Sequence, residues 1–290
     1  PESFAELIRL LDPTAILNPE RITRDDIAHL YVRRHKASDD VAAEVRGDWA
    51  DRLPPRPVAV TPSPVEEALF TELADTWTHP GPGGSPTSGK GRSLFPWTLF
   101  KAALSSHKAL VQTIEQRRKT IAAGTGDDGA PSADAAKEDA ALETLLDRAS
   151  AITDADASKL HALVAQLKDI GVGKGSTTRA VVFSERIATL DWLYDTVPGM
   201  LGLKQSQVRV LHGGLADVKQ MDVIEEFGLA GSEVRLLLTG DMASEGVNLH
   251  RQCHHLIHFD LPWSLITIEQ RNGRIDRYGQ RNSPDIRALV

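Results

Sequence analysis

Three arginines near the end of the chain have the residue type and the spacing of a phosphate-binding site. Arg271, Arg274 and Arg277 stand three positions apart, after Gln270 and around Gly273. On a helix, side chains three and four positions apart share one face, so the three guanidinium groups are expected to rise together. Guanidinium is planar, permanently charged and able to chelate a phosphate through two parallel hydrogen bonds. The pattern therefore favours a phosphate site over a solvated basic helix face.

The bulk composition limits the kind of protein that can carry these arginines. The chain has 290 residues, of which 41% are hydrophobic, as in a globular protein of one large or two small domains. The net charge of -7 excludes a surface that coats nucleic acid broadly, so a polyanion must bind in a local basic groove. The single cysteine, Cys253, excludes an internal disulfide and fits a reducing cytoplasm. We recognise no membrane span or signal peptide, and the opening at Pro1 predicts a fragment of a longer protein.

After Thr178 the sequence has the pattern of a parallel sheet. Apolar segments of strand length alternate with helix-like segments, as in strands covered by helices on both faces. The expected strands are 180–184, 208–211, 234–239 and 254–259, and the expected helices are 187–197, 215–227 and 264–276. Ligands of such sheets bind at the carboxyl ends of the strands. Polar and glycine-containing sequences stand at those ends, so we predict a site there.

The first 170 residues are largely helical by their pattern. Ser63 and Pro64 form a helix start, with a capping hydroxyl and a proline in the first turn. A short strand at 58–61, one long helix at 94–123 and further helix over 138–170 are expected from the apolar spacing. The small polar residues near 124–137 predict a mobile linker.

Two loops that resemble phosphate-binding loops and one histidine cluster are weaker candidates. Gly84–Lys90 matches the G-x-x-x-x-G-K pattern, but Gly91 stands where a magnesium-binding hydroxyl is needed. The similar loop at 171–177 follows a helix instead of a strand. Residues 253–258 combine one cysteine and three histidines, yet on a strand their side chains point to opposite faces and cannot converge. We therefore predict no metal site in this chain.

Two segments together resemble a known family. Residues 239–249 and 270–280 are similar to motifs V and VI of superfamily-two helicases, in the form typical of Swi/Snf-type ATPases. The resemblance is to the bacterial branch that includes the RNA-polymerase-associated ATPase. Residues 183–184 resemble motif IV, and residues 212–214 resemble a loop that the family places against a nucleic-acid backbone. The resemblance is dense over residues 179–282.

The resemblance implies a fold and one half of a motor. The family has two RecA-like lobes that bind ATP and Mg2+ between them, and the first lobe supplies a phosphate-binding lysine and an Asp-Glu pair. This chain has no Asp-Glu-x-His sequence and no acceptable lysine loop. We therefore expect an α/β fold in which residues 172–290 form the second RecA-like lobe, a parallel sheet with helices on both faces. Residues 57–171 are expected to be a helical insertion, and residues 1–56 the connection from an absent first lobe, so the chain alone should not hydrolyse ATP.

The resemblance also implies roles for single residues. Arg274 and Arg277 fall where the family places arginine fingers, which act on the γ-phosphate during phosphoryl transfer. Nucleotide contacts are expected from Gln270, Arg271, Glu245, Gly246 and Asn248. Nucleic-acid contacts are expected from Ser184, His212, Gly213, Thr239 and Gly240. Gly240 departs from the family pattern, which commonly has a threonine or serine there.

Three functions agree with these residues. The leading one is the second motor lobe of an ATP-dependent translocase that tracks double-stranded DNA. The alternatives are a strand-separating DNA or RNA helicase and, from another class, a non-catalytic lobe that only binds nucleic acid or protein. The expected partners are nucleic acid, the first lobe of the same protein and a protein such as RNA polymerase or a defence complex. The expected setting is the cytoplasm, in association with the nucleoid and without a membrane.

Overall fold

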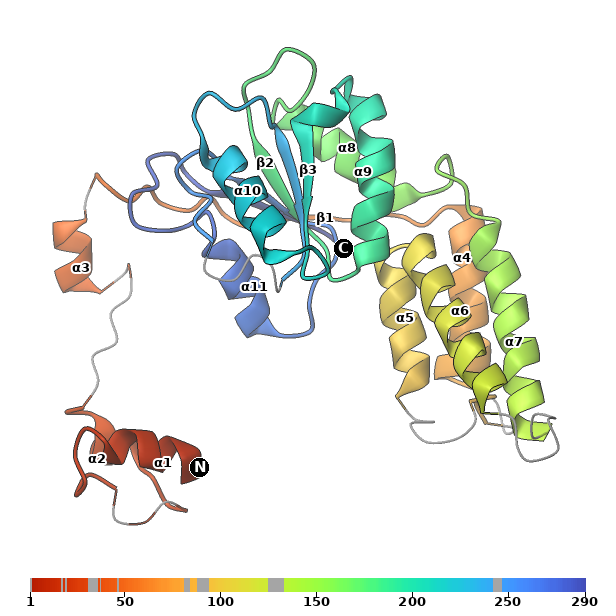
Figure 1. Ribbon diagram of the computed structural model, residues 1–290, viewed down its shortest axis with the longest axis horizontal. Helices are drawn as coiled ribbons and strands as arrows, with labels where there is room; N and C mark the ends of the chain where they lie inside the picture. Colours follow the sequence, from red (N-terminus) through yellow and green to blue (C-terminus); the bar gives the residue numbers. More distant parts are fainter. Residues whose placement is uncertain are drawn as a thin grey trace. The chain divides into compact units, whose positions relative to one another are not determined.

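The structure is a computed structural model that describes most of the chain (Figure 1). The described residues are 2–16, 18, 20–30, 36, 38–45, 47–80, 84–87, 94–124, 133–241 and 247–290. The chain divides into two compact units, Pro1–Asp48 and Trp49–Val290. Trp49 belongs to the larger unit, because its indole Nε1 donates a 2.8 Å hydrogen bond to Asp276. The predicted divisions after residues 56 and 171 stay predictions.

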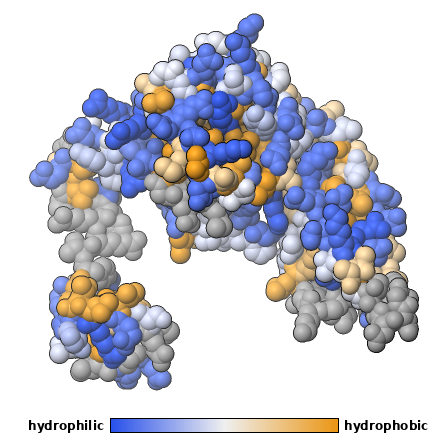
Figure 2. Space-filling view, viewed as in Figure 1, coloured by the Kyte–Doolittle hydropathy of each residue, from blue (hydrophilic) through white to orange (hydrophobic). Residues whose placement is uncertain are grey.

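The smaller unit is helical. Its described helices are α1 (Glu2–Arg9), α2 (Arg24–Ile27) and α3 (Asp39–Glu44). Ala5 and Ile8 of α1 pack with Ile16 in a small apolar cluster. The same helix leaves Phe4 and Leu7 exposed, and Figure 2 shows apolar atoms on the surface of this unit. The unit therefore buries only part of its apolar side chains.

The larger unit is built on a parallel sheet with the strand order β1-β6-β5-β2-β4-β3. Its strands are β1 (Arg56–Val58), β2 (Ala180–Phe183), β3 (Val208–Leu211), β4 (Leu236–Thr239), β5 (His255–His258) and β6 (Asp285–Leu289). Residues along β2 alternate between two cores, since Ala180 and Val182 enter one and Val181 and Phe183 enter the other. Such alternation marks a sheet whose two faces are both covered. The predicted α/β fold is confirmed.

Helices cover the two faces of this sheet. They are α8 (Ser158–Asp169), α9 (Ile187–Leu201), α10 (Asp217–Gly228) and α11 (Leu265–Asn272), with a 3-10 turn at Gln205–Gln207 before β3. On one face, Leu163 of α8 and Leu193 of α9 join Val182 in one core. On the other face, Phe227 of α10 packs with Ile275, which follows α11. Figure 1 shows α8 and α9 on the side of the sheet opposite to α10.

A helical bundle precedes the helix-covered sheet and has a core of its own. It contains α4 (Pro64–Glu72), which continues as a π-helix (Leu73–Thr78), and then α5 (Phe95–Ser105), α6 (His107–Ala123) and α7 (Ala133–Ser150). Trp77, Leu99, Leu110 and Leu142 are buried together in this core. Arg117 of α6 donates to the fully buried carboxylate of Glu138 on α7 through Nε at 2.7 Å and Nη2 at 3.0 Å. A bidentate pair of this kind fixes the register of the two helices.

The structure differs from the predicted elements in several places. The single helix expected at 94–123 is two helices, because Ser106 leaves helical geometry and its Oγ accepts from the Ala109 backbone N–H as the N-cap of α6. Helix α7 begins at Ala133, inside the range expected to be a linker, and residues 125–132 lie outside the described part. The strand expected at 58–61 is β1, two residues earlier. Strand β6 was not predicted.

Candidate functional site

Helix α11 positions the first of the three arginines and ends before the other two. Ser264 caps its start, where Oγ accepts from the Thr267 backbone N–H. The helix ends at Asn272, followed by Gly273, a residue with low helix propensity. Arg271 is therefore helical, whereas Arg274 and Arg277 lie in the turns that follow. The prediction that all three arginines share one helix face is wrong.

Arg271 is a buried structural anchor. Its side chain is 1% exposed, and its Nε and Nη2 donate to the Asp241 carboxylate at 2.5 and 2.9 Å. Nη1 donates to the Asp260 backbone carbonyl at 2.8 Å, and the guanidinium lies over the Phe183 ring. These contacts tie α11 to the carboxyl ends of β4, β5 and β2. A guanidinium with this many protein partners holds the site in shape.

His258 lies beside this anchor and is neutral near pH 7. Its Nε2 is 2.9 Å from the Asn272 side-chain oxygen, and its Nδ1 is 3.5 Å from Arg271 Nη1. Burial lowers the pKa of His258 to about 4, and the nearby Arg271 charge acts in the same direction. The imidazole therefore fills the space next to the guanidinium without adding a second positive charge.

Arg277 lies at the surface and contacts the end of motif V. Its Nη1 donates to the side-chain oxygen of Asn248, and both residues are exposed. The backbone N–H of Leu249 donates to the Arg274 carbonyl at 3.0 Å, which brings the two motifs side by side. Arg274 is half-buried and Gln270 is exposed.

Two of the predicted nucleotide contacts cannot be placed. Glu245 and Gly246 lie outside the described residues. The other three members of that set are Gln270 and Arg271 on α11 and Asn248 beside Arg277. The described part of the predicted nucleotide site is therefore centred on α11 and the turn that follows it.

The segment before β1 contacts the turn that carries Arg274 and Arg277, which we call the arginine turn. The Asp276 carboxylate accepts from Trp49 Nε1 and from Arg52 Nε, each at 2.8 Å. Arg52 also reaches Glu269 at 3.4 Å. These partners are more than 200 positions apart in the chain, so no local sequence pattern could have paired them. Trp49, Arg52 and Asp276 were not among the predicted site residues.

The predicted nucleic-acid residues divide into buried and exposed groups. Ser184 and Thr239 have no exposed surface. Gly240 is half-buried, and a Cβ at that position would meet the Ser184 carbonyl and the His212 side chain at ordinary contact distances. His212 is half-buried, and its Nδ1 accepts from the Gly214 backbone N–H at 3.1 Å. Gly213 is exposed, so the surface of this group is the loop after β3.

A buried hydroxyl network surrounds Asp260, which stands at one of the predicted strand ends but was assigned no role of its own. Its Oδ2 accepts from Ser184 Oγ at 2.6 Å and from Ser105 Oγ at 2.7 Å. Its Oδ1 accepts from the Glu185 backbone N–H at 2.9 Å. Ser105 ends α5, so the network joins the helical bundle to the ends of β2 and β5.

In the cysteine and histidine cluster at 253–258, the ring centroids of His254 and His255 are 4.0 Å apart, contrary to the predicted alternation, and His258 lies beside Arg271. Burial raises the pKa of the Cys253 thiol to about 12, which makes this cysteine an unreactive core residue at neutral pH. Among the described residues, no three His, Cys, Asp or Glu side chains gather where they could hold a metal ion. Within the same residues, no helix is long and apolar enough to span a bilayer.

Comparison with known proteins identifies the part of the chain that contains this site. Residues 158–279 match the helicase conserved C-terminal domain family. The chain is 27% identical over 231 residues to the uncharacterized ATP-dependent helicase YqhH of Bacillus subtilis (strain 168), an alignment that covers 77% of this chain and 34% of that protein. It is 36% identical over 81 residues to the RNA polymerase-associated protein RapA of Serratia proteamaculans (strain 568), which covers 28% of this chain and 8% of that protein. The chain thus spans about a third of the first relative and less than a tenth of the second.

Solved structures share the fold at low sequence identity. The C-terminal part of the Fun30 ATPase domain is 18% identical, with a TM-score of 0.55 over 83% of this chain and 85% of that chain. The Pyrococcus furiosus Hef helicase domain is 15% identical, with a TM-score of 0.57 over 94% of this chain and 62% of that chain. Residues 158–279 therefore match the helicase conserved C-terminal domain, the larger unit has the RecA-like fold of these helicase structures, and part of the chain is similar in sequence to RapA.

Proposed function

We propose that this chain supplies the second motor lobe of an ATP-dependent, Swi/Snf-type translocase that tracks double-stranded DNA. Its relatives YqhH and RapA are named as an ATP-dependent helicase and an RNA polymerase-associated protein. In this proposal a first lobe outside the chain supplies most of the contacts to ATP and Mg2+. The present lobe adds positive charge from the other side of the nucleotide.

The observation that carries the proposal is that the arginines differ in exposure and in partners. Arg271 is buried and donates to the Asp241 carboxylate and the Asp260 carbonyl. Arg277 is exposed and donates to Asn248. A buried anchor holds the turn, and an exposed guanidinium with a neighbouring side-chain amide suits phosphate oxygens. Arg274 and Arg277 are the proposed fingers, which stabilise the charge that develops during phosphoryl transfer.

The remaining residues of the predicted site take supporting roles in this proposal. Gln270 and Asn248 are exposed, and Asn248 accepts a hydrogen bond from Arg277. Glu245 and Gly246 belong to the same proposed nucleotide contacts. His212, Gly213 and Gly240 are proposed to face the nucleic-acid backbone. The buried Ser184 and Thr239 are proposed to support that surface from beneath.

The test of the finger proposal is a pair of substitutions in the full-length protein. Arg277→Ala should lower DNA-stimulated ATP turnover by roughly 10³-fold or more, with nucleotide affinity nearly unchanged. Arg277→Lys should recover little, because an ammonium lacks the planar fork. Arg281→Ala is the matched control, since Arg281 is also exposed nearby and should turn over ATP normally. Unchanged turnover in Arg277→Ala would remove this arginine from the reaction.

The choice of substrate is tested separately. A duplex tracker should hydrolyse ATP faster with double-stranded DNA than with single-stranded DNA or RNA, and it should displace a third strand from a triplex without separating the duplex. Separation of the duplex would favour the strand-separating alternative. Nucleic-acid binding with no ATP turnover in the full-length protein would favour a non-catalytic lobe.

A further inference from the structure

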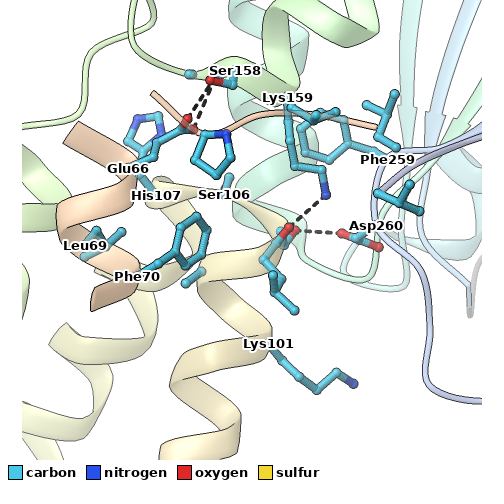
Figure 3. Close-up of a pocket in the computed structure, with 18 of the residues that line it drawn as sticks. Glu66, Leu69, Phe70, Lys101, Ser106, His107, Ser158, Lys159, Phe259 and Asp260 are labelled. Carbon is cyan, nitrogen blue, oxygen red and sulfur yellow. Dashed lines mark hydrogen bonds between the residues drawn. The ribbon is translucent and has the colours of Figure 1, made fainter. Parts of the chain in front are cut away.

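A cavity of about 340 Å³ lies between the helical bundle and the helix-covered sheet, away from the arginine turn. Figure 3 shows Leu69 and Phe70 of α4 on one side and Phe259, at the end of β5, on the other. Trp192 and Leu289 complete much of its apolar wall. The volume and the mainly apolar lining are those of a small-molecule pocket.

Lys159 brings a positive charge to this cavity with unused donors. Its Nζ donates to the Leu104 backbone carbonyl at 2.8 Å and lies 5.0 Å from the centre of the Phe259 ring. An ammonium group has three N–H donors, so two remain for another partner. Burial lowers the pKa of Lys159 to about 8, while the charges of Asp260 and Glu66 oppose that shift. At pH 7 the amine is therefore mostly protonated.

The carboxylates that line the cavity are already satisfied. Glu66 accepts from the backbone N–H groups of Ser63 at 2.8 Å and Ser158 at 3.2 Å, as part of the caps of α4 and α8. The Asp260 carboxylate is occupied by the hydroxyl network described above. Glu185 also lines the cavity and pairs with Lys101 at 3.1 Å. None of these three carboxylates forms an ion pair with Lys159 in the described part of the chain, so the two remaining Lys159 donors have no carboxylate partner there.

His107 adds a second unsatisfied group. The residue is 6% exposed, and its Nε2 is buried with no hydrogen-bond partner among the described residues. The ring packs edge-on against Trp192, with 4.9 Å between the centroids. Burial lowers its pKa to about 4, so the imidazole is neutral at pH 7. An unpaired buried polar atom destabilises the fold, and a ligand atom bonded to it would remove that cost.

We propose that this cavity binds a small aromatic carboxylate that also carries a hydroxyl group. The carboxylate accepts hydrogen bonds from Lys159, and the aromatic body rests against Phe70, Trp192 and Phe259. The hydroxyl group suits His107 Nε2 in either tautomer, because it can donate or accept a hydrogen bond. The proposal is independent of any reaction at Arg274 and Arg277.

Binding of 6-hydroxy-2-naphthoate to the purified chain, followed by calorimetry and by melting temperature, tests the proposal. We expect one saturable site and a raised melting temperature. 2-Naphthol, which lacks the carboxylate, should bind at least about tenfold more weakly, because charge-assisted hydrogen bonds are the stronger ones. Equal affinity for the two compounds, or the absence of saturable binding, would refute the assignment.

Variants locate the binding in the cavity. Lys159→Met should weaken 6-hydroxy-2-naphthoate about tenfold or more, whereas Lys108→Met, which removes an exposed lysine of α6, should leave the affinity unchanged. His107→Phe should abolish the preference for 6-hydroxy-2-naphthoate over 2-naphthoate. Leu104→Trp keeps the backbone carbonyl and adds a ring at the partly exposed wall, so it should block binding while the protein still melts cooperatively. Retained affinity in both Lys159→Met and Leu104→Trp would overturn the proposal.

Discussion

Asp276 shows how single residues hold the arginine turn. Its carboxylate lies between Arg274 and Arg277 in sequence and accepts from both Trp49 and Arg52. The Asp276 side chain is 9% exposed and that of Arg52 is 29% exposed, so the pair is screened only partly by solvent. These two hydrogen bonds keep the Asp276 carboxylate directed toward residues 49–52 and so fix the turn that carries the two proposed fingers.

Arg52→Met should therefore destabilise the larger unit. We expect a loss of about 1–2 kcal/mol in the free energy of unfolding, because a mostly buried carboxylate loses its charged partner but keeps Trp49. Asp276→Asn combined with Arg52→Met should cost less than the sum of the two single changes. Denaturant unfolding of the four proteins measures this coupling. Additive losses would show that Arg52 and Asp276 do not interact in solution.

Buried histidines should make the protein sensitive to acid. Burial is the main cause that lowers the pKa values of His107, His255 and His258 from 6.5 to about 4. The unfolded chain then binds protons more readily than the folded chain between these values, so stability falls as the pH falls from 6.5 towards 4. Each histidine can contribute about 1–3 kcal/mol to the loss.

Denaturant unfolding at pH 7, 5.5 and 4.5 checks this expectation. His107→Phe should lose less stability than the original protein over the same range, because one of the three proton-binding groups is gone. His161→Phe is a control, since His161 is exposed. An identical pH dependence in His107→Phe and His161→Phe would contradict the buried, neutral state of His107.

At the scale of elements, Asp260 connects the helical bundle to the arginine site. Its carboxylate binds Ser105 at the end of α5 and Ser184 at the end of β2, and its backbone carbonyl binds Arg271 of α11. Buried polar networks of this kind stabilise one arrangement when every member is satisfied. A change in the position of the bundle would therefore displace Asp260 and, through its carbonyl, Arg271 of α11.

Ser105→Ala should weaken this connection. We expect a loss of about 1–2 kcal/mol in the free energy of unfolding, because the carboxylate keeps Ser184 and the Glu185 N–H but loses a buried donor. Thr120→Ala is a matched control, since its hydroxyl donates to the Gln116 carbonyl on the exposed face of α6. Chemical denaturation of both variants is the measurement. A loss no larger in Ser105→Ala than in Thr120→Ala would contradict the network.

The apolar pattern predicted the elements better than it predicted their contacts. Segments such as 180–184 and 208–211 can be recognised as strands from the sequence, because a strand buried on both faces is continuously apolar. Strand β6 was missed because Asp285 and Arg287 interrupt its apolar pattern. In the structure the two pair with each other at 2.8 Å, and Arg287 also pairs with Asp169. The break at Ser106 depends on a local cap that competes with continued helix.

The candidate site shows the same division. Motif spacing selected Arg271, Arg274 and Arg277, but it could not show that one of them is buried against Asp241, which is 30 positions away. Nor could it show that residues 49–52 fold back onto Asp276. Contacts between distant segments follow from how the sheet and its connections pack, and a local pattern carries no record of them.

At the scale of the whole molecule, the glycine-lysine loop at 171–177 stands apart from Arg271. The loop at 171–177 leads into the amino end of β2, whereas Ser184, Asp260 and Arg271 gather at the carboxyl ends of the strands. Gly171 and Gly175 take positive φ values of 88° and 76° after helix α8, and Lys174 is exposed. This loop therefore lies at the edge of the sheet opposite to Arg271. In the other loop, Gly91 replaces the hydroxyl residue that the phosphate-loop pattern requires.

The purified chain should consequently release no phosphate from ATP above background, with or without duplex DNA. Arginine fingers stabilise charge on a phosphate that other groups must hold. One glycine-lysine loop lacks the hydroxyl residue that this role requires, and the other follows a helix instead of a strand. A phosphate-release assay at equal concentrations of the chain and the full-length protein makes the comparison, and only the full-length protein should respond to DNA. Turnover by the chain that Arg277→Ala abolishes would mean that this lobe binds and hydrolyses ATP with residues of its own. The chain contains the whole sheet, the helical bundle and the partners of Asp276, so we expect it to be folded. The melting transition used for the cavity variants checks that absence of turnover does not result from unfolding.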